Sequence, residues 1–471
     1  MPIQDSGGSA RLSNFRAELN GFPWLTAGVL YTLSWGWSLL RPNTLYWDDW
    51  AYIFNQPKSY LNEIFVDTGL PPWRAIIDQE LIAFGYWTIP FLTFLMFFSV
   101  GVFLWLILQD TKLFSNSQIS FLVLTFILLP INHSRIALVL FGYSTSYFLF
   151  FFGWALTVRN RSIATFVLAI VMFFWSFMTH SFIFFYLFPV AHFVIKSARP
   201  KKSLLRNHRL IIEVLILLAL PFLYFVLRRF FWYPKPEWIG YQSVRIGGSL
   251  MGLRFLIVGL FVSGVIAYLA WKTTRQMRSS IVLITGWALF AFGLFPYFAS
   301  GRFRSWLEVF SFRSDWGGRH IMLTPLGAGL ILLSLRDFIP VNLQKIASRA
   351  MISLCVSVNI FFGTQFYLDS LKKDELVTLL ANASDTNKFD RNSEIIFVDE
   401  TKLFNGRWST YRDPELINKL FLAKVSAKSI TGKVTCSELP QGLELRLKSD
   451  KSYLSALSSR DLGLYLEFNN C

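Results

Sequence analysis

Long apolar segments recur along most of this chain and constrain its fold more than any other feature. A run of about 20 apolar residues crosses the hydrocarbon core of a bilayer as a helix, because a helix satisfies its own backbone groups there. Eleven such segments can be placed, at residues 24–40, 83–108, 119–138, 141–158, 163–179, 182–195, 210–227, 250–271, 281–299, 321–335 and 350–367. The sequence therefore predicts an all-α polytopic membrane protein with about 11 transmembrane helices.

The composition agrees with a membrane protein. Hydrophobic residues make up 54% of the chain and charged residues 16%, whereas a soluble domain has about 25% charged residues. The formal net charge of +16 would favour a nucleic-acid partner in a soluble protein, but here the basic residues must be assigned loop by loop. We expect membrane lipids as partners, and no nucleic acid.

The distribution of basic residues predicts the topology. Cytoplasmic loops carry an excess of Lys and Arg, and alternate loops at 159–161, 196–209 and 272–278 are basic here. This bias indicates a multi-pass protein of the plasma (inner) membrane with residues 1–20 as a cytoplasmic tail. No short signal peptide is expected before the first span, because that segment is long enough to stay in the bilayer. Residues 21–367 then form the transmembrane domain.

Amphipathic segments follow the first span, at residues 57–84. Pro57 and Pro71 each precede a stretch that mixes apolar and charged residues, and Pro is favoured at the start of a helix. We expect short helices that lie along the outer membrane face. The alternative, a plain connection outside the membrane, is nearly as well supported for the first stretch.

Residues 368–471 are more polar than the rest and predict a small extracytoplasmic α/β domain. Asp413-Pro414-Glu415 is typical of a helix start, and alternating leucines at 443–447 and 462–468 indicate half-buried strands. Cys436 and Cys471 bracket these strands, and an oxidising compartment would join them in a disulfide. Cys355, inside a span, is expected to be a small apolar residue.

An acidic pair between two tryptophans, Trp47-Asp48-Asp49-Trp50, lies just beyond the first span. Adjacent carboxylates at a membrane edge pack poorly, but they can accept a proton or bind a cation. An enzyme is therefore the leading hypothesis. The alternative is an acidic pair that ends a helix and is solvated.

Basic residues are unusually frequent on the predicted outer side, where they are normally scarce. Guanidinium groups match phosphate oxygens with two parallel hydrogen bonds, so this set indicates a phosphate-bearing ligand. Arg228 and Arg229 could instead extend to lipid headgroups. The set comprises Arg135, His180, Arg228, Arg229, Lys235, Arg245, Arg302, Arg304, Arg313 and Arg319.

The stretch from Ser311 to His320 is the most specific part of this set. Gly317 and Gly318 lie between aromatic residues and arginines just before a predicted span. Free backbone amides and Arg319 could converge there on one anion at a helix N-terminus. A tight turn before a helix would explain the glycines equally well, but not the charged residues around them.

Two of these motifs resemble those of the GT-C superfamily of polyprenyl-phosphate-sugar glycosyltransferases. Asp48-Asp49-Trp50-Ala51-Tyr52 is similar to the Asp-Asp or Asp-Glu motif of that family, and Gly318-Arg319-His320-Ile321-Met322-Leu323-Thr324-Pro325 is similar to its Arg-Tyr-x-x-Pro type of motif. The resemblance covers the topology of residues 20–370 and these two short motifs. It departs from the family pattern at His320, which replaces Tyr, and at Pro325, which is displaced by one or two residues.

The resemblance implies an inverting transfer of a sugar from a polyprenyl-phosphate donor to a hydroxyl of an envelope glycan or glycolipid, as in bacterial enzymes that modify O-antigen or lipopolysaccharide with undecaprenyl-phosphate sugars. Asp48 would act as base, and Asp49 would orient the acceptor or hold a cation. The phosphate and substrate contacts would come from Arg319, Arg313, Arg302, Arg304, His320, Trp47 and Trp50.

A divalent cation is the one cofactor that the pattern suggests. His180 and Asp49 could hold Mg²⁺, Mn²⁺ or Ca²⁺, as some proteins of the resembled family do, but a lone interfacial histidine is more often a hydrogen-bonded structural residue. No Cys-rich or HExxH metal motif is present in the sequence.

Other functions remain open at this point. An O-antigen ligase or polymerase also uses outer arginines, but does not need the early acidic pair. A lipid-linked glycan transporter would need ionisable residues deep in the spans, whereas Asp110, Glu213 and Asp337 lie at predicted cytoplasmic ends. A scaffold with a periplasmic binding domain is a further alternative.

Overall fold

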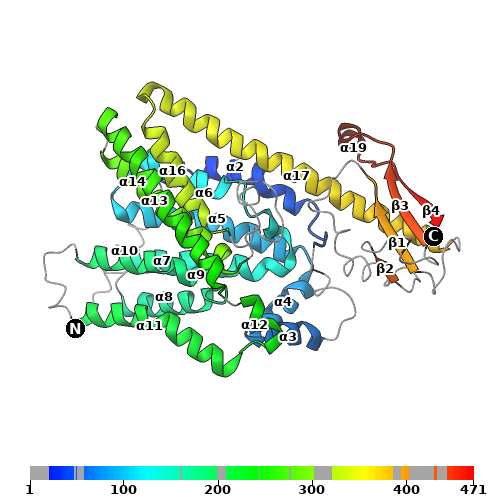
Figure 1. Cartoon of the computed structure of the whole chain (residues 1–471), viewed down its shortest axis with the longest axis horizontal. Coiled ribbons are helices and arrows are strands. Elements are labelled where there is room, and N and C mark those ends of the chain that lie inside the picture. The colour runs from blue at the N-terminus through cyan, green and yellow to red at the C-terminus, as the bar shows by residue number, and fades with distance from the viewer. Residues whose placement is uncertain are drawn as a thin grey trace, which may run out of the picture.

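The structure is a computed structural model of the 471-residue chain. It describes residues 21–46, 49, 58–159, 162–198, 208–242, 244–274, 277–301, 321–385, 394–401, 429–431, 437 and 443–471. Helices dominate it, and a small sheet lies near the C-terminus (Figure 1).

The described helices fall in the order that the apolar segments predict. In chain order they are α2 (Trp24–Trp35), η1 (Gly36–Leu39), α3 (Lys58–Asp67), α4 (Pro72–Phe84), α5 (Thr88–Thr111), α6 (Asn116–Leu128), η3 (His133–Ile136), η4 (Leu138–Leu140), α7 (Phe141–Arg159), α8 (Ile163–Ser176), α9 (Ser181–Phe185), α10 (Leu187–Ala198), α11 (His208–Phe231), α12 (Pro236–Gln242), α13 (Ile246–Thr274), α14 (Met277–Ala299), α16 (Thr324–Asp337), α17 (Val341–Asp385) and α19 (Tyr453–Ser459).

Six described helical stretches are long and apolar enough to cross a membrane. Shorter apolar helices occupy residues 116–128, 163–176 and 181–197. The protein is thus a predominantly helical, multi-pass membrane protein, but the predicted count of about 11 spans is not confirmed. The six stretches are Thr88–Thr111, Leu138–Arg159, His208–Phe231, Ile246–Lys272, Met277–Ala299 and Val341–Ala383.

Helix α6 ends earlier than the apolar run that contains it. The run 119–138 predicts one span, whereas the helix stops at Leu128 and Leu129 adopts an extended conformation with ψ of 125°. Pro130 explains this stop, because the residue before a proline is disfavoured in helical geometry. Asn132, at a left-handed φ of 59°, then turns the chain into η3.

The two amphipathic segments do form helices, α3 and α4. Helix α4 buries charged residues and exposes apolar ones. Arg74, Ala75 and Asp78 are buried, whereas Ile76 and Phe84 are exposed. An exposed apolar face with a charged buried face fits a helix that contacts lipid rather than water. Helices α3, α4 and α12 gather at one end of the bundle (Figure 1).

Glycines allow α14 and α16 to pack closely. A Cβ atom added at Gly327 of α16 would lie 2.2 Å from the backbone nitrogen of Phe290 in α14. One added at Gly286 of α14 would lie 2.9 Å from the backbone nitrogen of Ile331 in α16. Small residues at such positions let helix backbones approach each other within a membrane.

Helix α17 runs without interruption for 45 residues. At 1.5 Å per residue it is about 68 Å long, more than twice the thickness of the hydrocarbon core. It crosses most of the molecule and ends beside the sheet (Figure 1). The predicted domain boundary between residues 367 and 368 falls inside this helix.

The sheet contains β1 (Glu394–Asp399), β2 (Ser429–Thr431), β3 (Leu443–Ser449) and β4 (Leu464–Asn470) in the order β2-β1-β3-β4. Strand β1 is parallel to β2 and β3, and β3 is antiparallel to β4. The leucines predicted at 443–447 fall on β3, and those predicted at 462–468 fall on β4 except Leu462, which precedes the strand.

The sheet packs on the end of α17. Leu376 and Leu380 of the helix share a buried cluster with Phe397 of β1 and Leu445 of β3. Cys471 is disulfide-bonded and Cys355 is a free thiol. Cys436, its predicted partner, lies outside the described residues, as does the predicted helix start at Asp413.

Candidate functional site

The loop that follows η1 is fixed to the rest of the protein through Asp49. One carboxylate oxygen of Asp49 accepts a hydrogen bond from the backbone N–H of Tyr46 at 2.9 Å, and the other accepts one from the backbone N–H of Val139 at 2.9 Å. The Asp49 side chain is completely buried. Both oxygens are therefore used to hold backbone, which makes Asp49 a positioning residue for the acidic loop.

The pKa of Asp49 is shifted toward neutrality. Burial away from water raises it from 3.8 to about 7, against the opposing effects of the backbone hydrogen bonds and of the Lys373 charge. Desolvation penalises the charged form of a carboxyl group, whereas hydrogen bonds and a nearby cation favour it. Desolvation outweighs both here, so the carboxyl group changes its charge close to physiological pH.

Helix α17 also contacts this loop. The ammonium group of Lys373 donates a hydrogen bond to the carbonyl of Leu45 at 2.8 Å, lies 3.7 Å from the ring centre of Tyr46, and pairs with Asp369 at 3.1 Å. Arg41 forms an ion pair with Asp374 one residue further along. The acidic loop is thus bound by α17 on one side and by Val139 on the other.

Val139 belongs to the segment between α6 and α7, which is held in place from inside the protein. Within this segment the His133 ring is fully buried and lies 3.2 Å from the side-chain oxygen of Asn359 in α17. The Asn359 amide donates in turn to the carbonyl of Leu128 at 2.7 Å. These contacts fix the backbone that carries Arg135, two residues after His133.

Arg135 is a buried cation in an aromatic environment. Its guanidinium carbon lies 3.3 Å from the ring centre of Trp35, 4.3 Å from that of Phe97 and 5.9 Å from that of Tyr31. The side chain is 8% exposed. Cation–π contacts of this kind offset part of the cost of removing a guanidinium group from water.

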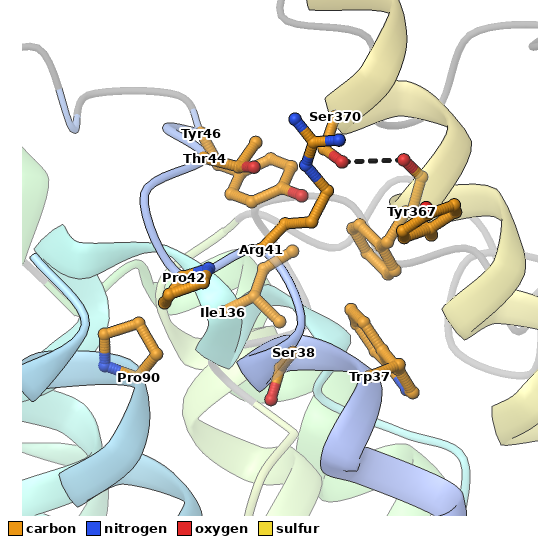
Figure 2. A pocket seen from close by; sticks show the side chains of 11 residues that line it. Trp37, Ser38, Arg41, Pro42, Thr44, Tyr46, Pro90, Ile136, Tyr367 and Ser370 are labelled. Carbon is orange, nitrogen blue, oxygen red and sulfur yellow. Dashed lines mark hydrogen bonds between the residues drawn. The ribbon is translucent and has the colours of Figure 1, made fainter. Parts of the chain in front are cut away.

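Three adjoining pockets surround this segment. The first, of about 310 Å³ including its open mouth, is lined by residues of the loop, of η1 and of α17, among them Arg41, Tyr46 and Ser370. Figure 2 shows Arg41 extending from the loop past Tyr46 toward Ser370. This pocket is aromatic and hydroxyl-rich.

The second and third pockets meet at Arg135. The second shares Ser38, Pro90 and Ile136 with the first, and Arg135 lines both the second and the third. The third, of about 320 Å³ including its open mouth, has Phe126 and Met322 in its wall. The side chain of Arg135 therefore lies between the second and the third pocket.

Most of the residues predicted for the site lie outside the described part of the chain. Asp49 is described, and it contacts backbone rather than an open cavity. The residues outside the description are Trp47, Asp48, Trp50, Arg302, Arg304, Arg313, Arg319 and His320.

His180 has an apolar environment. Its ring lies 5.6 Å from that of Phe225 and 6.0 Å from that of Tyr224. Burial, reinforced by the Arg228 charge, lowers the pKa of His180 from 6.5 to about 3. Among the residues that the structure describes, no three His, Cys, Asp or Glu side chains gather to hold a metal ion, so these positions give the proposed cation at His180 or Asp49 no further ligands.

Sequence reasoning placed Arg135 among ten basic residues but did not select it. The sequence does contain a feature that could have selected Arg135: Pro130 and Asn132 interrupt the apolar run just after Leu129. An arginine just after such a break lies on irregular backbone, and irregular backbone at membrane depth is tolerated where it lines a cavity or is buried in protein.

Comparisons with known proteins add no identification. No protein-family model, no curated protein and no solved structure matches this chain. Its function is therefore inferred from its own residues.

Proposed function

We propose that this protein is a membrane glycosyltransferase that moves a sugar from a polyprenyl-phosphate donor to a hydroxyl of an envelope glycan or glycolipid. One observation supports this proposal above the others: the hydrogen bond between Asp49 and Val139 at 2.9 Å joins the acidic loop to the segment that carries Arg135. This contact supports the proposal because transfer from a phosphate ester calls for an acidic group and a positive charge near each other.

The proposed reaction divides the work between the two neighbouring aspartates. Asp48 accepts the proton of the acceptor hydroxyl as the hydroxyl oxygen attacks the anomeric carbon of the donor sugar. The bond between that carbon and the phosphate oxygen breaks, polyprenyl phosphate leaves, and the anomeric configuration inverts. Asp49 holds the loop through its two backbone hydrogen bonds, so its contribution is to position Asp48.

Cationic groups would stabilise the departing phosphate. Arg319, with Arg313, Arg302 or Arg304, remains a proposed source of these contacts, and the described part of the chain adds Arg135. Positive charge that is already in place where negative charge develops lowers the barrier to group transfer. The site would open on the outer side of the membrane, and the proposed small extracytoplasmic domain, 368–471, would lie next to it.

Local ion pairs weigh against a transporter. Asp110 pairs with Lys196 and His192, Glu213 pairs with Arg209, and Asp337 pairs with Arg336. Transport would call for ionisable residues that are available along a path through the spans. These three carboxylates are instead occupied by partners near helix ends, and the buried Asp369 of α17 is paired with Lys373.

The test is a transfer assay with the full-length protein in bilayer nanodiscs. Asp48→Asn should lower the turnover by about 10²- to 10⁴-fold, the usual contribution of a general base, without loss of expression or donor binding. The matched control is Asp461→Asn, at an aspartate on the surface that pairs with Lys451. Undiminished turnover in Asp48→Asn would remove the base assignment.

A second comparison separates glycosyl transfer from the ligase alternative. Sugar donors that carry a polyprenyl monophosphate should be used, and those that carry a diphosphate should not. Use of the diphosphate donor alone would indicate an O-antigen ligase or polymerase and contradict the proposal.

A further inference from the structure

Arg254 is a lone cation in a long apolar helix. It lies in the stretch Ile246–Lys272 of α13, and it is the only charged residue between Ile246 and Trp271. Its side chain is exposed and has no salt bridge or hydrogen bond to another described residue. Ionisable residues are rare in membrane-spanning segments and normally have a partner. Arginine cannot lose its charge in a protein, so this charge calls for a partner from outside the chain.

The two sides of α13 have different surroundings. A Cβ atom added at Gly252 would lie 3.0 Å from the Phe295 ring of α14, so this side of the helix packs on α14. The other side exposes large apolar side chains, with exposed fractions of 51% for Leu250 and 58% for Ile257. Arg254 follows Leu250 by four positions and precedes Ile257 by three, so it shares their face. Its guanidinium group therefore leaves the helix on the lipid side.

The length of α13 places Arg254 near the boundary of the hydrocarbon core. Trp271 and Lys272 are both exposed, and such residues are typical of a membrane interface. Arg254 precedes Lys272 by 18 residues, or about 27 Å along the helix at 1.5 Å per residue. The hydrocarbon core is about 30 Å thick. With Lys272 at one interface, Arg254 is therefore close to the headgroups of the opposite leaflet.

We infer that Arg254 binds the phosphate group of a phospholipid in the leaflet at the N-terminal end of α13. An arginine lays its apolar stem along apolar surface while its charge reaches the interface. A guanidinium edge matches two oxygens of a phosphate, and the exposed side chains of Leu250 and Ile257 suit the acyl chains of the same lipid. This site is separate from the proposed sugar transfer and does not depend on it.

The contact would fix the depth of two helices. With Arg254 at the level of the phosphates, the turns of α13 that precede it lie in the headgroup layer. Just before these turns, the backbone N–H of Arg245 donates to the carbonyl of Ala299, the last residue of α14, at 2.7 Å. The neighbouring ends of α13 and α14 are therefore held at one level, and the lipid contact sets that level for both.

The inference can be tested by removing phosphate from the bilayer. The full-length protein is placed in nanodiscs of phosphatidylcholine or of digalactosyldiacylglycerol, a bilayer lipid that has no phosphate. In phosphatidylcholine, Arg254→Gln should lower the midpoint of thermal unfolding by about 2 °C, because a charge-assisted contact is lost. In the galactolipid the two proteins should unfold at the same temperature. An equal difference in both lipids, or no difference in either, would overturn the inference.

Arg460→Gln is the matched control. Arg460 is an exposed arginine that follows α19, beside the sheet rather than on a span. Any change that this substitution causes in the unfolding midpoint should be the same in both lipids, because no phospholipid contact is removed. A lipid-dependent change in the control as large as that in Arg254→Gln would show that the assay does not report on Arg254, and would remove the support for the inference.

Solid-state NMR tests the contact directly. The protein is labelled with ¹³C at the guanidinium carbon of arginine in phosphatidylcholine vesicles, and the Arg254 signal is the one that Arg254→Gln lacks. Dipolar coupling to the ³¹P of the lipid should weaken this signal, and an undiminished signal would contradict the contact. If Arg254→Gln instead converted an oligomer to monomers, the partner would be a second copy of the chain and the assignment to a lipid would be wrong.

Discussion

The carboxylate of Asp49 accepts a hydrogen bond from the backbone N–H of Val139, 90 residues further along the chain. This single contact joins the loop after the first helix to the irregular segment between α6 and α7. Within the acidic pair, Asp49 therefore holds backbone with both of its carboxylate oxygens.

The raised pKa of Asp49, about 7 against 3.8 for a free side chain, predicts a specific dependence of stability on pH. Between pH 4 and 7 the folded protein keeps this proton while the unfolded chain releases it. The free energy of unfolding of the wild type should therefore fall relative to that of Asp49→Asn, by on the order of 3–4 kcal/mol across this range.

Thermal unfolding in nanodiscs at several pH values measures this difference. Asp461→Asn serves as the control, because the pKa of Asp461 is lowered by Lys451 and that variant should not show the same trend. A difference between wild type and Asp49→Asn that stays constant with pH would show that Asp49 is not buried as described.

The ion pair between Lys373 and Asp369, at 3.1 Å, should be strongly coupled because both side chains are buried. Lys373→Met leaves the Asp369 carboxylate without its cation and should lower the free energy of unfolding by about 3–5 kcal/mol. Adding Asp369→Asn should recover part of this loss. A double-mutant cycle measured by thermal unfolding gives the coupling energy.

Lys345→Met is the matched control for this cycle. Lys345 lies on the same helix and is exposed, so its loss should change the free energy of unfolding by less than about 0.5 kcal/mol. Strictly additive effects of the Lys373 and Asp369 changes would contradict the pairing.

The close packing of α14 and α16 should not tolerate a methyl group at Gly327. Its added Cβ would lie 2.2 Å from backbone of α14, which cannot move as a flexible side chain could. Gly327→Ala should therefore lower the free energy of unfolding by about 1–3 kcal/mol. Gly264→Ala, in α13, meets no atom within 4 Å and should stabilise the helix by about 0.5–1 kcal/mol.

Thermal unfolding of these two variants side by side distinguishes packing from helix propensity. If both substitutions raised the unfolding midpoint, α14 and α16 would have to lie further apart than they do in the structure.

Local sequence patterns predicted some of the elements. The alternating leucines at 443–447 anticipated β3, and Pro71 anticipated the start of α4, because both signals depend on residues adjacent in the chain. The number of spans was harder to predict, since apolar composition continues past Leu128, where Pro130 ends the helix.

The site depended on contacts that no local pattern contains. Trp35 stacks on Arg135 from 100 residues away, and Asn359 reaches His133 across 226 residues. Sequence reasoning could note that Arg135 is a basic residue near a membrane edge, but its burial is decided by these distant partners. For the same reason Asp49 was expected to take part in chemistry, whereas the structure gives both of its oxygens to backbone.

Helix α17 is one continuous rod from Val341 to the sheet. Leu376 and Leu380 of this helix pack against the strands. The ammonium group of Lys373, on the same helix, lies 3.7 Å from the ring centre of Tyr46. The sheet and the loop after η1 are therefore held by the same helix at positions within about one turn of each other, Leu376 and Lys373.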